Sequence, residues 1–221
     1  MIINKLRIYT SQLPEQSNFY EKVLGLTLTN KTENSVDFKI GYSIFTLSQK
    51  DSATPYHFAI NIPANKDREA LDWLKQRVPV LKDDDAELID FSNWNAKAMY
   101  FYDCDKNIVE LIARRNLNIQ TDAPFDQNHF LGISEIGLPV QNIEDTYRQI
   151  QAIKDIKIYD GNLDRFCAVG DEQGLFIIID QNKKRWFPCN DAAYSSDFEI
   201  HGDFNIEFRN GQIKKSQLSA N

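Results

Sequence analysis

The chain has 221 residues, of which 42% are hydrophobic and 12% aromatic. This composition is typical of a folded protein and excludes a disordered chain, and the length fits one compact domain built from repeats or one domain with a smaller appendage. The formal charge of −7 disfavours nucleic acid as a partner, because binding to its phosphates depends on clustered Lys and Arg. No apolar stretch approaches the roughly 20 residues of a membrane helix, and the first residues lack a signal-peptide pattern, so we expect a cytoplasmic protein without membrane contact.

The first part of the chain predicts one β-α-β-β-β unit. Residues 2–9 alternate between apolar and polar side chains, which is the period of a half-buried strand. Pro14 can open a helix and Gly25 can end it, and apolar residues recur at helical spacing between them. Three short strands are expected near residues 26–30, 35–40 and 43–47.

The same order of elements then recurs. A strand over 56–62 and a helix over 66–77 precede strands near 88–91, 96–102 and 107–114. Lys5 and His57 occupy equivalent positions in the two first strands. Such self-similarity indicates a fold built from repeated units.

A third, degenerate copy follows a linker. We predict a paired domain over 1–115, a linker over 116–130, and a third module with a C-terminal tail over 131–221. The third copy has a strand near 133–140, a helix near 143–153 and strands near 157–159, 166–169 and 175–180. A lone copy cannot bury both its faces, so it should pack on the first pair, on the tail or on another subunit, which makes a homodimer plausible.

Two segments carry a resemblance to a known family. Residues 19–26, FYEKVLGL, and residues 103–111, DCDKNIVEL, resemble the helix end and the last hairpin of vicinal-oxygen-chelate proteins. This superfamily includes glyoxalases, bleomycin-resistance proteins and extradiol dioxygenases. The resemblance implies an α+β, glyoxalase-like fold in which the sheets of tandem βαβββ modules form a cup, here with a third partial module.

The resemblance also implies a metal site, built from residues in the first and last strands of each module. Carried over, these positions are Lys5 and either Phe45 or Thr46 in the first module, and His57 and Glu110 in the second. Only His57 and Glu110 can ligate a metal, which could be Fe, Mn, Ni or Zn, and Glu110 is also the candidate catalytic residue. The Lys5 ammonium has no lone pair, so a Lys5–Glu110 ion pair could instead replace the metal and leave the site without one.

Strand alternation adds candidate substrate-binding residues. It places Arg7, Tyr9, Asn61 and Arg114 on the same face as the metal positions, where they and Lys5 would suit a small anionic or phenolic ligand. A solvated charged edge is the alternative interpretation of the basic residues. Glu135 stands at the equivalent position of the third module, but no His lies at a matching position, so it is left outside the candidate site.

Three functions stay open at this point. The first is a metal-dependent lyase or ring-cleaving extradiol dioxygenase with an incomplete metal triad. The second is a metal-free protein that binds or sequesters a small molecule, as in the bleomycin-resistance branch. The third is a non-catalytic interaction role for the third module and the tail. A shared fold does not decide between them.

Overall fold

The computed structural model describes residues 1–216 and contains three β-α-β-β-β modules, the second with one extra strand, followed by three tail strands. The first module consists of β1 (Ile3–Thr10), α1 (Leu13–Asn18) with a π-helical turn (Phe19–Val23), β2 (Thr27–Lys31), β3 (Ser35–Ile40) and β4 (Ser43–Gln49). The second consists of β5 (His57–Ile62), α2 (Asp67–Lys75), β6 (Val80–Leu81), β7 (Ile89–Phe91), β8 (Ala96–Tyr102) and β9 (Ile108–Arg114). The third consists of β10 (Gly132–Val140), α3 (Ile143–Ile153), β11 (Ile158–Gly161), β12 (Phe166–Asp171) and β13 (Gly174–Asp180). The tail contains β14 (Phe198–Gly202), β15 (Ile206–Arg209) and β16 (Gln212–Lys215).

The strands form two sheets, and their order corrects one expectation. A seven-stranded sheet has the order β16-β15-β14-β1-β4-β3-β2, and a nine-stranded sheet runs β11-β12-β13-β10-β5-β9-β8-β6, with β7 paired to β8. The first module is therefore joined to the tail, through antiparallel β1 and β14, and the second module to the third, through antiparallel β5 and β10. The residues of β1 that were expected on the same face as His57 and Glu110 therefore lie in a different sheet. Alternation in a strand specifies which face is buried, but it does not specify the neighbour at a free edge.

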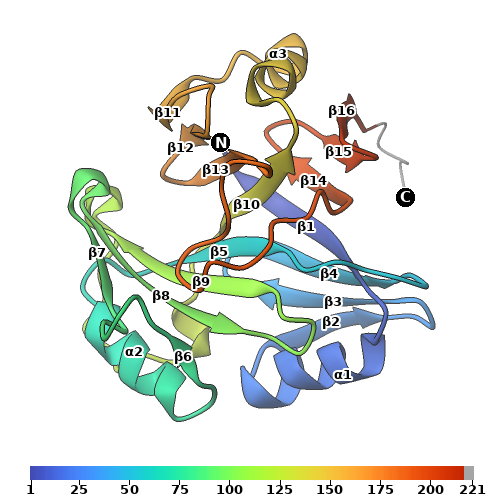
Figure 1. Ribbon diagram of the computed structural model, residues 1–221. Helices are drawn as coiled ribbons and strands as arrows, with labels where there is room; N and C mark the ends of the chain where they lie inside the picture. The colour runs from blue at the N-terminus through green and yellow to red at the C-terminus, as the bar shows by residue number, and fades with distance from the viewer. Residues whose placement is uncertain (217–221) are drawn as a thin grey trace.

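The predicted α+β fold and its cup are confirmed. In Figure 1, α1 and α2 lie at one end of the molecule and α3 at the other, beside the tail strands. The concave face of the nine-stranded sheet is named the cup here. The equivalent face of the seven-stranded sheet is named the β1–β14 face.

The main core lies between the two sheets. Phe45 of β4 and Phe58 of β5 contact across it, with ring centroids 5.1 Å apart. Along β5, Phe58 and Ile60 enter this core, while alternation turns His57 and Ala59 to the cup. Every residue of β5 is buried, so this strand is covered on both faces. A polar group on its cup side must therefore find partners inside the protein.

The third module packs against the second module of the same chain, since β10 is fully buried between β5 and β13. A homodimer, which the sequence offered as another way to bury this module, stays a prediction. None of the helices in residues 1–216 has the length and apolar character that a membrane crossing needs.

Candidate functional site

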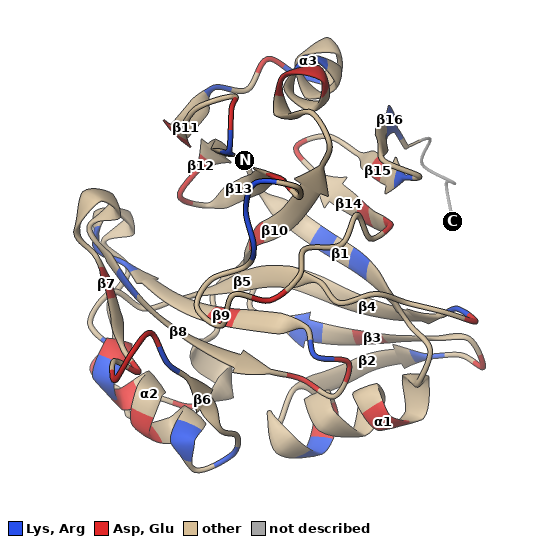
Figure 2. Ribbon diagram, viewed as in Figure 1, with Lys and Arg blue, Asp and Glu red and all other residues tan. Residues whose placement is uncertain are grey.

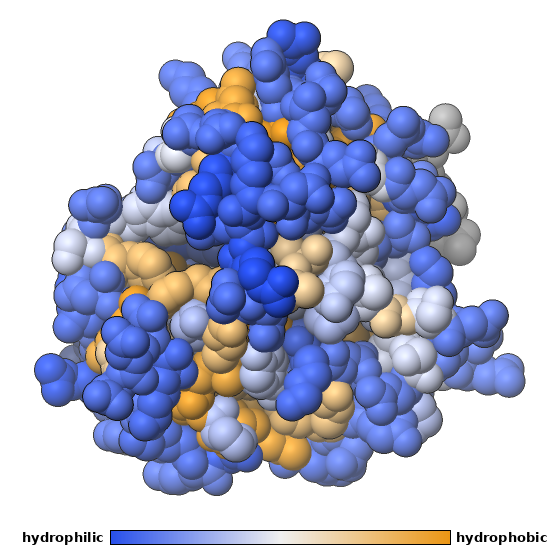
Figure 3. All heavy atoms as spheres, in the orientation of Figure 1, coloured by the Kyte–Doolittle hydropathy of each residue, from blue (hydrophilic) through white to orange (hydrophobic). Residues whose placement is uncertain are grey.

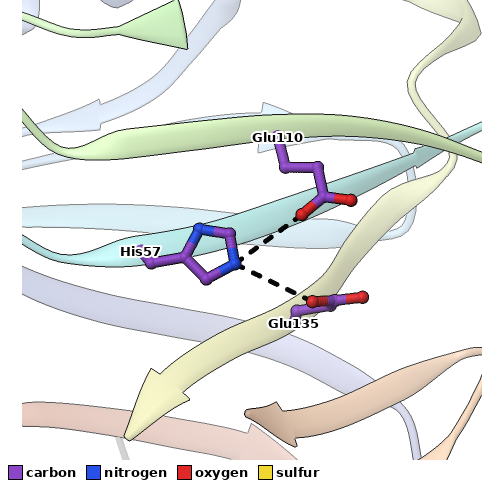
Figure 4. Close-up of side chains that lie close together, drawn as sticks. All are labelled: His57, Glu110 and Glu135. Atoms are coloured by element: carbon purple, nitrogen blue, oxygen red, sulfur yellow. Dashed lines mark ion pairs between the residues drawn. The ribbon is translucent and has the colours of Figure 1, made fainter. Parts of the chain in front are cut away.

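Three side chains that can bind a metal converge in the cup. They are His57 of β5, Glu110 of β9 and Glu135 of β10 (Figure 4). The His57 Nε2 atom lies 3.6 Å from Glu110 Oε2 and 3.9 Å from Glu135 Oε2. The three residues are only 6%, 3% and 2% exposed, respectively. The site is thus a buried cluster contributed by two modules.

The register of the central strands explains this convergence. Ala59 of β5 pairs with Glu110 on its parallel neighbour and with Glu135 on its antiparallel neighbour. Residues two apart in a strand share a face, so His57 points to the same side as Ala59. The small Ala59 side chain leaves the space between the two carboxylates open.

The environment of His57 keeps its imidazole neutral and oriented. Its Nδ1 lies 3.1 Å from the Ile108 carbonyl oxygen, which as an acceptor requires the proton on Nδ1. Burial lowers the pKa of His57 to about 4. The Nε2 lone pair therefore faces the carboxylates at neutral pH, as in metal-binding histidines whose other nitrogen donates to a carbonyl.

The two glutamates carry more negative charge than their surroundings balance. Burial raises the pKa of Glu110, and the neighbouring charge of Glu135 raises it further. Burial also raises the pKa of Glu135, although the buried Arg114 guanidinium donates a hydrogen bond to it and opposes the shift. One cation beside two carboxylates leaves a site that favours a proton or a metal ion.

The donor set fits a divalent metal ion. The three ligand atoms all lie within 4.8 Å of one another. A neutral imidazole nitrogen with two carboxylate oxygens suits Fe, Mn or Zn. The sequence-based view of the site was incomplete, because Glu135, left outside the candidate site, is its third member.

The last strand of the third module has a side chain that cannot bind a metal at the position equivalent to Glu110. Gly137 of β10 pairs with Ile177 of β13 in the same parallel register in which Ala59 pairs with Glu110. Ile177 therefore occupies the place in the third module that Glu110 has in the second, and it is 5% exposed in the cup. Three residues thus form the candidate ligand set, and the side beside Ile177 is apolar.

The triad opens into a cavity of about 510 Å³. Aromatic side chains dominate its wall: Phe91, Trp94, Tyr100, Phe166, Trp186 and Phe187. Figure 3 shows apolar surface and a hollow on this face of the molecule. Charged side chains outside the triad, Asp90, Asp160 and Lys184, also line the cavity. A cavity that combines aromatic walls with polar groups is typical of a small-molecule site.

Three predicted substrate-binding residues lie on the β1–β14 face instead. Lys5 Nζ is 3.7 Å from Asp37, so the anticipated Lys5–Glu110 ion pair does not form. Arg7 pairs with Glu199 at 3.3 Å, and the Tyr9 hydroxyl donates to Glu199. Figure 2 shows basic positions on β1 and acidic positions on β14. These residues are separated from the cup because β1 belongs to the other sheet.

The β1–β14 face retains the geometry of the cup with different side chains. Arg7 pairs with Thr46 on β4 and with Glu199 on β14, as Ala59 pairs with the two glutamates of the triad. Lys5 is thus the equivalent of His57, as predicted from the repeat. Thr46, rather than Phe45, takes the last-strand position, and Phe45 is in the core.

The other two predicted residues lie near the triad but are engaged within the protein. The Arg114 Nε donates to Asn61 Oδ1 at 3.2 Å, and Asn61 Nδ2 donates to the Glu172 carbonyl. Neither residue lines the cavity. Their role in binding a substrate stays a prediction, and their observed contacts instead position Glu135.

No protein-family model matches the sequence, and no curated protein has a significantly similar one. Solved structures match the fold. A proposed dioxygenase from Bacillus subtilis superposes with a TM-score of 0.60 at 16% identity over 81% of this chain and 63% of its own. A variant of glyoxalase I from Zea mays gives a TM-score of 0.53 at 15% identity over 80% of this chain and 66% of its own. The chain therefore spans slightly less than two thirds of the length of either protein, and these likenesses concern the fold.

Proposed function

We propose that this chain, which has the fold of the vicinal-oxygen-chelate superfamily, is an enzyme that holds a divalent metal ion at His57, Glu110 and Glu135. The observation that carries the proposal is the convergence of these three buried side chains at one place in an aromatic cavity. A purely structural role would require two neighbouring carboxyl groups to be buried with one cation beside them, which is costly. The fold neighbours described as a dioxygenase and a glyoxalase support the same class of chemistry.

Each ligand residue contributes a distinct property. His57 offers a neutral nitrogen fixed by the Ile108 carbonyl. Glu135 is held by Arg114, whereas Glu110 has no cation bonded to it and its pKa is raised by burial. Glu110 therefore suits the acid–base role, because burial favours its protonated form, and a carboxyl group that can hold and release a proton can act as a general acid or base. A metal bound here would supply Lewis acidity or activate dioxygen.

The cavity indicates the class of substrate. Its aromatic walls favour a flat ring, since aromatic pairs contribute beyond the area that they bury. Two neighbouring oxygens on such a ring, as in a phenolic compound of the catechol type, could reach the metal site together. We propose a small phenolic or anionic aromatic molecule as the ligand.

Metal content tests the proposal. Protein purified without chelator should contain close to one equivalent of Fe, Mn or Zn by elemental analysis, and His57→Ala and Glu135→Gln should each lose most of it. His129→Ala is the matched control, because His129 pairs with Asp126 in a different part of the chain. Wild-type protein that takes up no metal after incubation with these ions would overturn the proposal.

A metal-free binding protein is the second candidate. One observation favours it: Arg114 already gives Glu135 a counter-ion within the protein. In that case the same measurements would find no metal, while phenolic ligands would still bind to the chelator-treated protein.

A further inference from the structure

The segment of residues 181–197, which links β13 to β14, is named the strap here. It passes across the cup in Figure 1. Trp186 and Asp191 close a tight loop in it through two backbone hydrogen bonds of 2.9 and 3.2 Å. The Tyr102 hydroxyl of β8 donates to the Asp191 carboxylate, which ties this loop to the sheet.

Trp186 separates two cavities over one continuous strip of the sheet. Besides the cavity at the triad, a second one of about 440 Å³ lies on the other side of Trp186, which lines both. Along β9, Ile108 lines the second cavity and Glu110 the first. Along β8, Tyr102 lines the second cavity and Tyr100 the first. These pairs are two residues apart on one face, so the two cavities are halves of a single trough.

The Trp186 ring is packed firmly in this place. It is 6% exposed, and its centroid lies 4.9 Å from that of His57. A Cβ added at Gly137 would lie 2.7 Å from the ring, so only glycine leaves room for the indole there. The ring is therefore a fixed partition beside the metal-binding histidine.

The two halves of the trough differ in charge. The first carries the acids Glu110 and Glu135 on its floor and Asp90 and Asp160 on its wall, against the single cation Lys184. The second is lined by the cations Lys106 and Arg185, while its acid, Asp191, is engaged by Tyr102. A long ligand with an aromatic ring at the triad would thus place an anionic end among these cations.

We propose that Trp186 determines the specificity of the site by limiting the length of the ligand, and that the second cavity would otherwise receive an anionic extension. The proposal rests on the proposed function only in taking the first cavity as the substrate site. With the indole in place, the site accepts molecules that end at His57. Without it, the trough extends toward Lys106.

The test uses chelator-treated full-length protein, so that its result does not depend on the metal. Toluidinonaphthalene sulfonate is a long, anionic aromatic probe that fluoresces in apolar sites, and naphthol is a short, neutral one. Trp186→Ala should bind the long probe at least about tenfold more tightly than wild type, because a second ring becomes buried. Binding of naphthol should change by no more than about threefold.

Two further variants make the test specific. Trp94→Ala also removes an indole, but Trp94 lines only the first cavity, so it should give no gain for the long probe. Lys106→Ala should leave binding of the long probe to wild type unchanged and weaken binding to the Trp186→Ala protein about fivefold. Trp186→Phe, which keeps a ring in the partition, should behave as wild type and controls for folding.

Three results would overturn the proposal: no gain in Trp186→Ala, an equal gain in Trp94→Ala, or an equal effect of Lys106→Ala in both backgrounds. Its failure is distinguishable from failure of the proposed function. Absence of bound metal with a gain in Trp186→Ala rejects the metal centre alone, and bound metal without the gain rejects the partition alone.

Discussion

Arg114 should be essential to the stability of the metal-free protein. Its side chain is fully buried, and it is the cation that contacts Glu135. Arg114→Met keeps much of the volume and removes the charge, which leaves two buried carboxylates without a bonded cation. Breaking a buried ion pair by removing one partner costs about 3–5 kcal/mol.

Proton uptake sets an independent limit on this cost. The variant can neutralise a carboxyl group instead of burying its charge. From an ordinary pKa of 4.5, this costs about 4 kcal/mol at pH 7.5, at about 1.36 kcal/mol per unit. At pH 5.5 it costs only about 1 kcal/mol by the same factor. The destabilisation should therefore be about 3–4 kcal/mol at pH 7.5 and about 1 kcal/mol at pH 5.5.

Urea unfolding in the presence of chelator at both pH values measures this difference. Arg148→Met is the matched control, because its ion pair with Glu144 is exposed and should contribute no more than about 0.5 kcal/mol. Combining Arg114→Met with Glu135→Gln should recover most of the loss at pH 7.5. A cost for Arg114→Met that is small, or equal at the two pH values, would refute the reasoning.

Three further predictions concern other parts of the molecule. The pKa of His57 falls from 6.5 to about 4 on folding, so its contribution to stability is present above pH 6.5 and is lost as pH falls toward 4. In urea titrations with chelator, His57→Gln should therefore remove about 3 kcal/mol of the dependence of stability on acid pH. The raised pKa of Glu110 acts in the opposite direction, because the stability that it contributes is lost as pH rises. Gly137→Ala should lower stability by about 1–3 kcal/mol in urea unfolding, because the added methyl group meets Trp186. An unchanged unfolding midpoint would show that Trp186 and the strap can move aside without loss of stability. Lys5→His should leave metal affinity in calorimetric titration unchanged, since Lys5 lies on the β1–β14 face; tighter binding would place it at the metal after all.

The repeat and part of the site could be predicted from the sequence. The residue patterns indicated three β-α-β-β-β units, and the equivalence of Lys5 and His57 is confirmed by the register of their sheets. His57 and Glu110 do lie together, because both depend only on the local order of strands within one module. Local patterns carry this information since alternation fixes the face of each residue.

The partner module could not be predicted in the same way. β1 and β5 each have an edge that another module can cover, and both sequences alternate equally well. The choice depends on which strand, β10 or β14, reaches that edge in three dimensions. Glu135 was left outside the candidate site because its own module has no matching His, and its place beside His57 could be recognised only once β10 was placed beside β5.

The residue between the flanking strands adds to the difference between the two equivalent faces, where Lys5 and Thr46 already replace His57 and Glu110. Each has a glutamate on the strand antiparallel to its first strand, Glu135 in the cup and Glu199 on the β1–β14 face. The residue between the flanking strands is Ala59 in the cup and Arg7 on the other face. The guanidinium groups of Arg7 and Arg209 lie 3.3 and 2.9 Å from Glu199 and balance its charge from within the protein. In the cup, Arg114 pairs with Glu135, but the Ala59 methyl group neither fills the space between the two glutamates nor brings a second cation to Glu110, so the cup keeps the space and the charge that a metal ion would need.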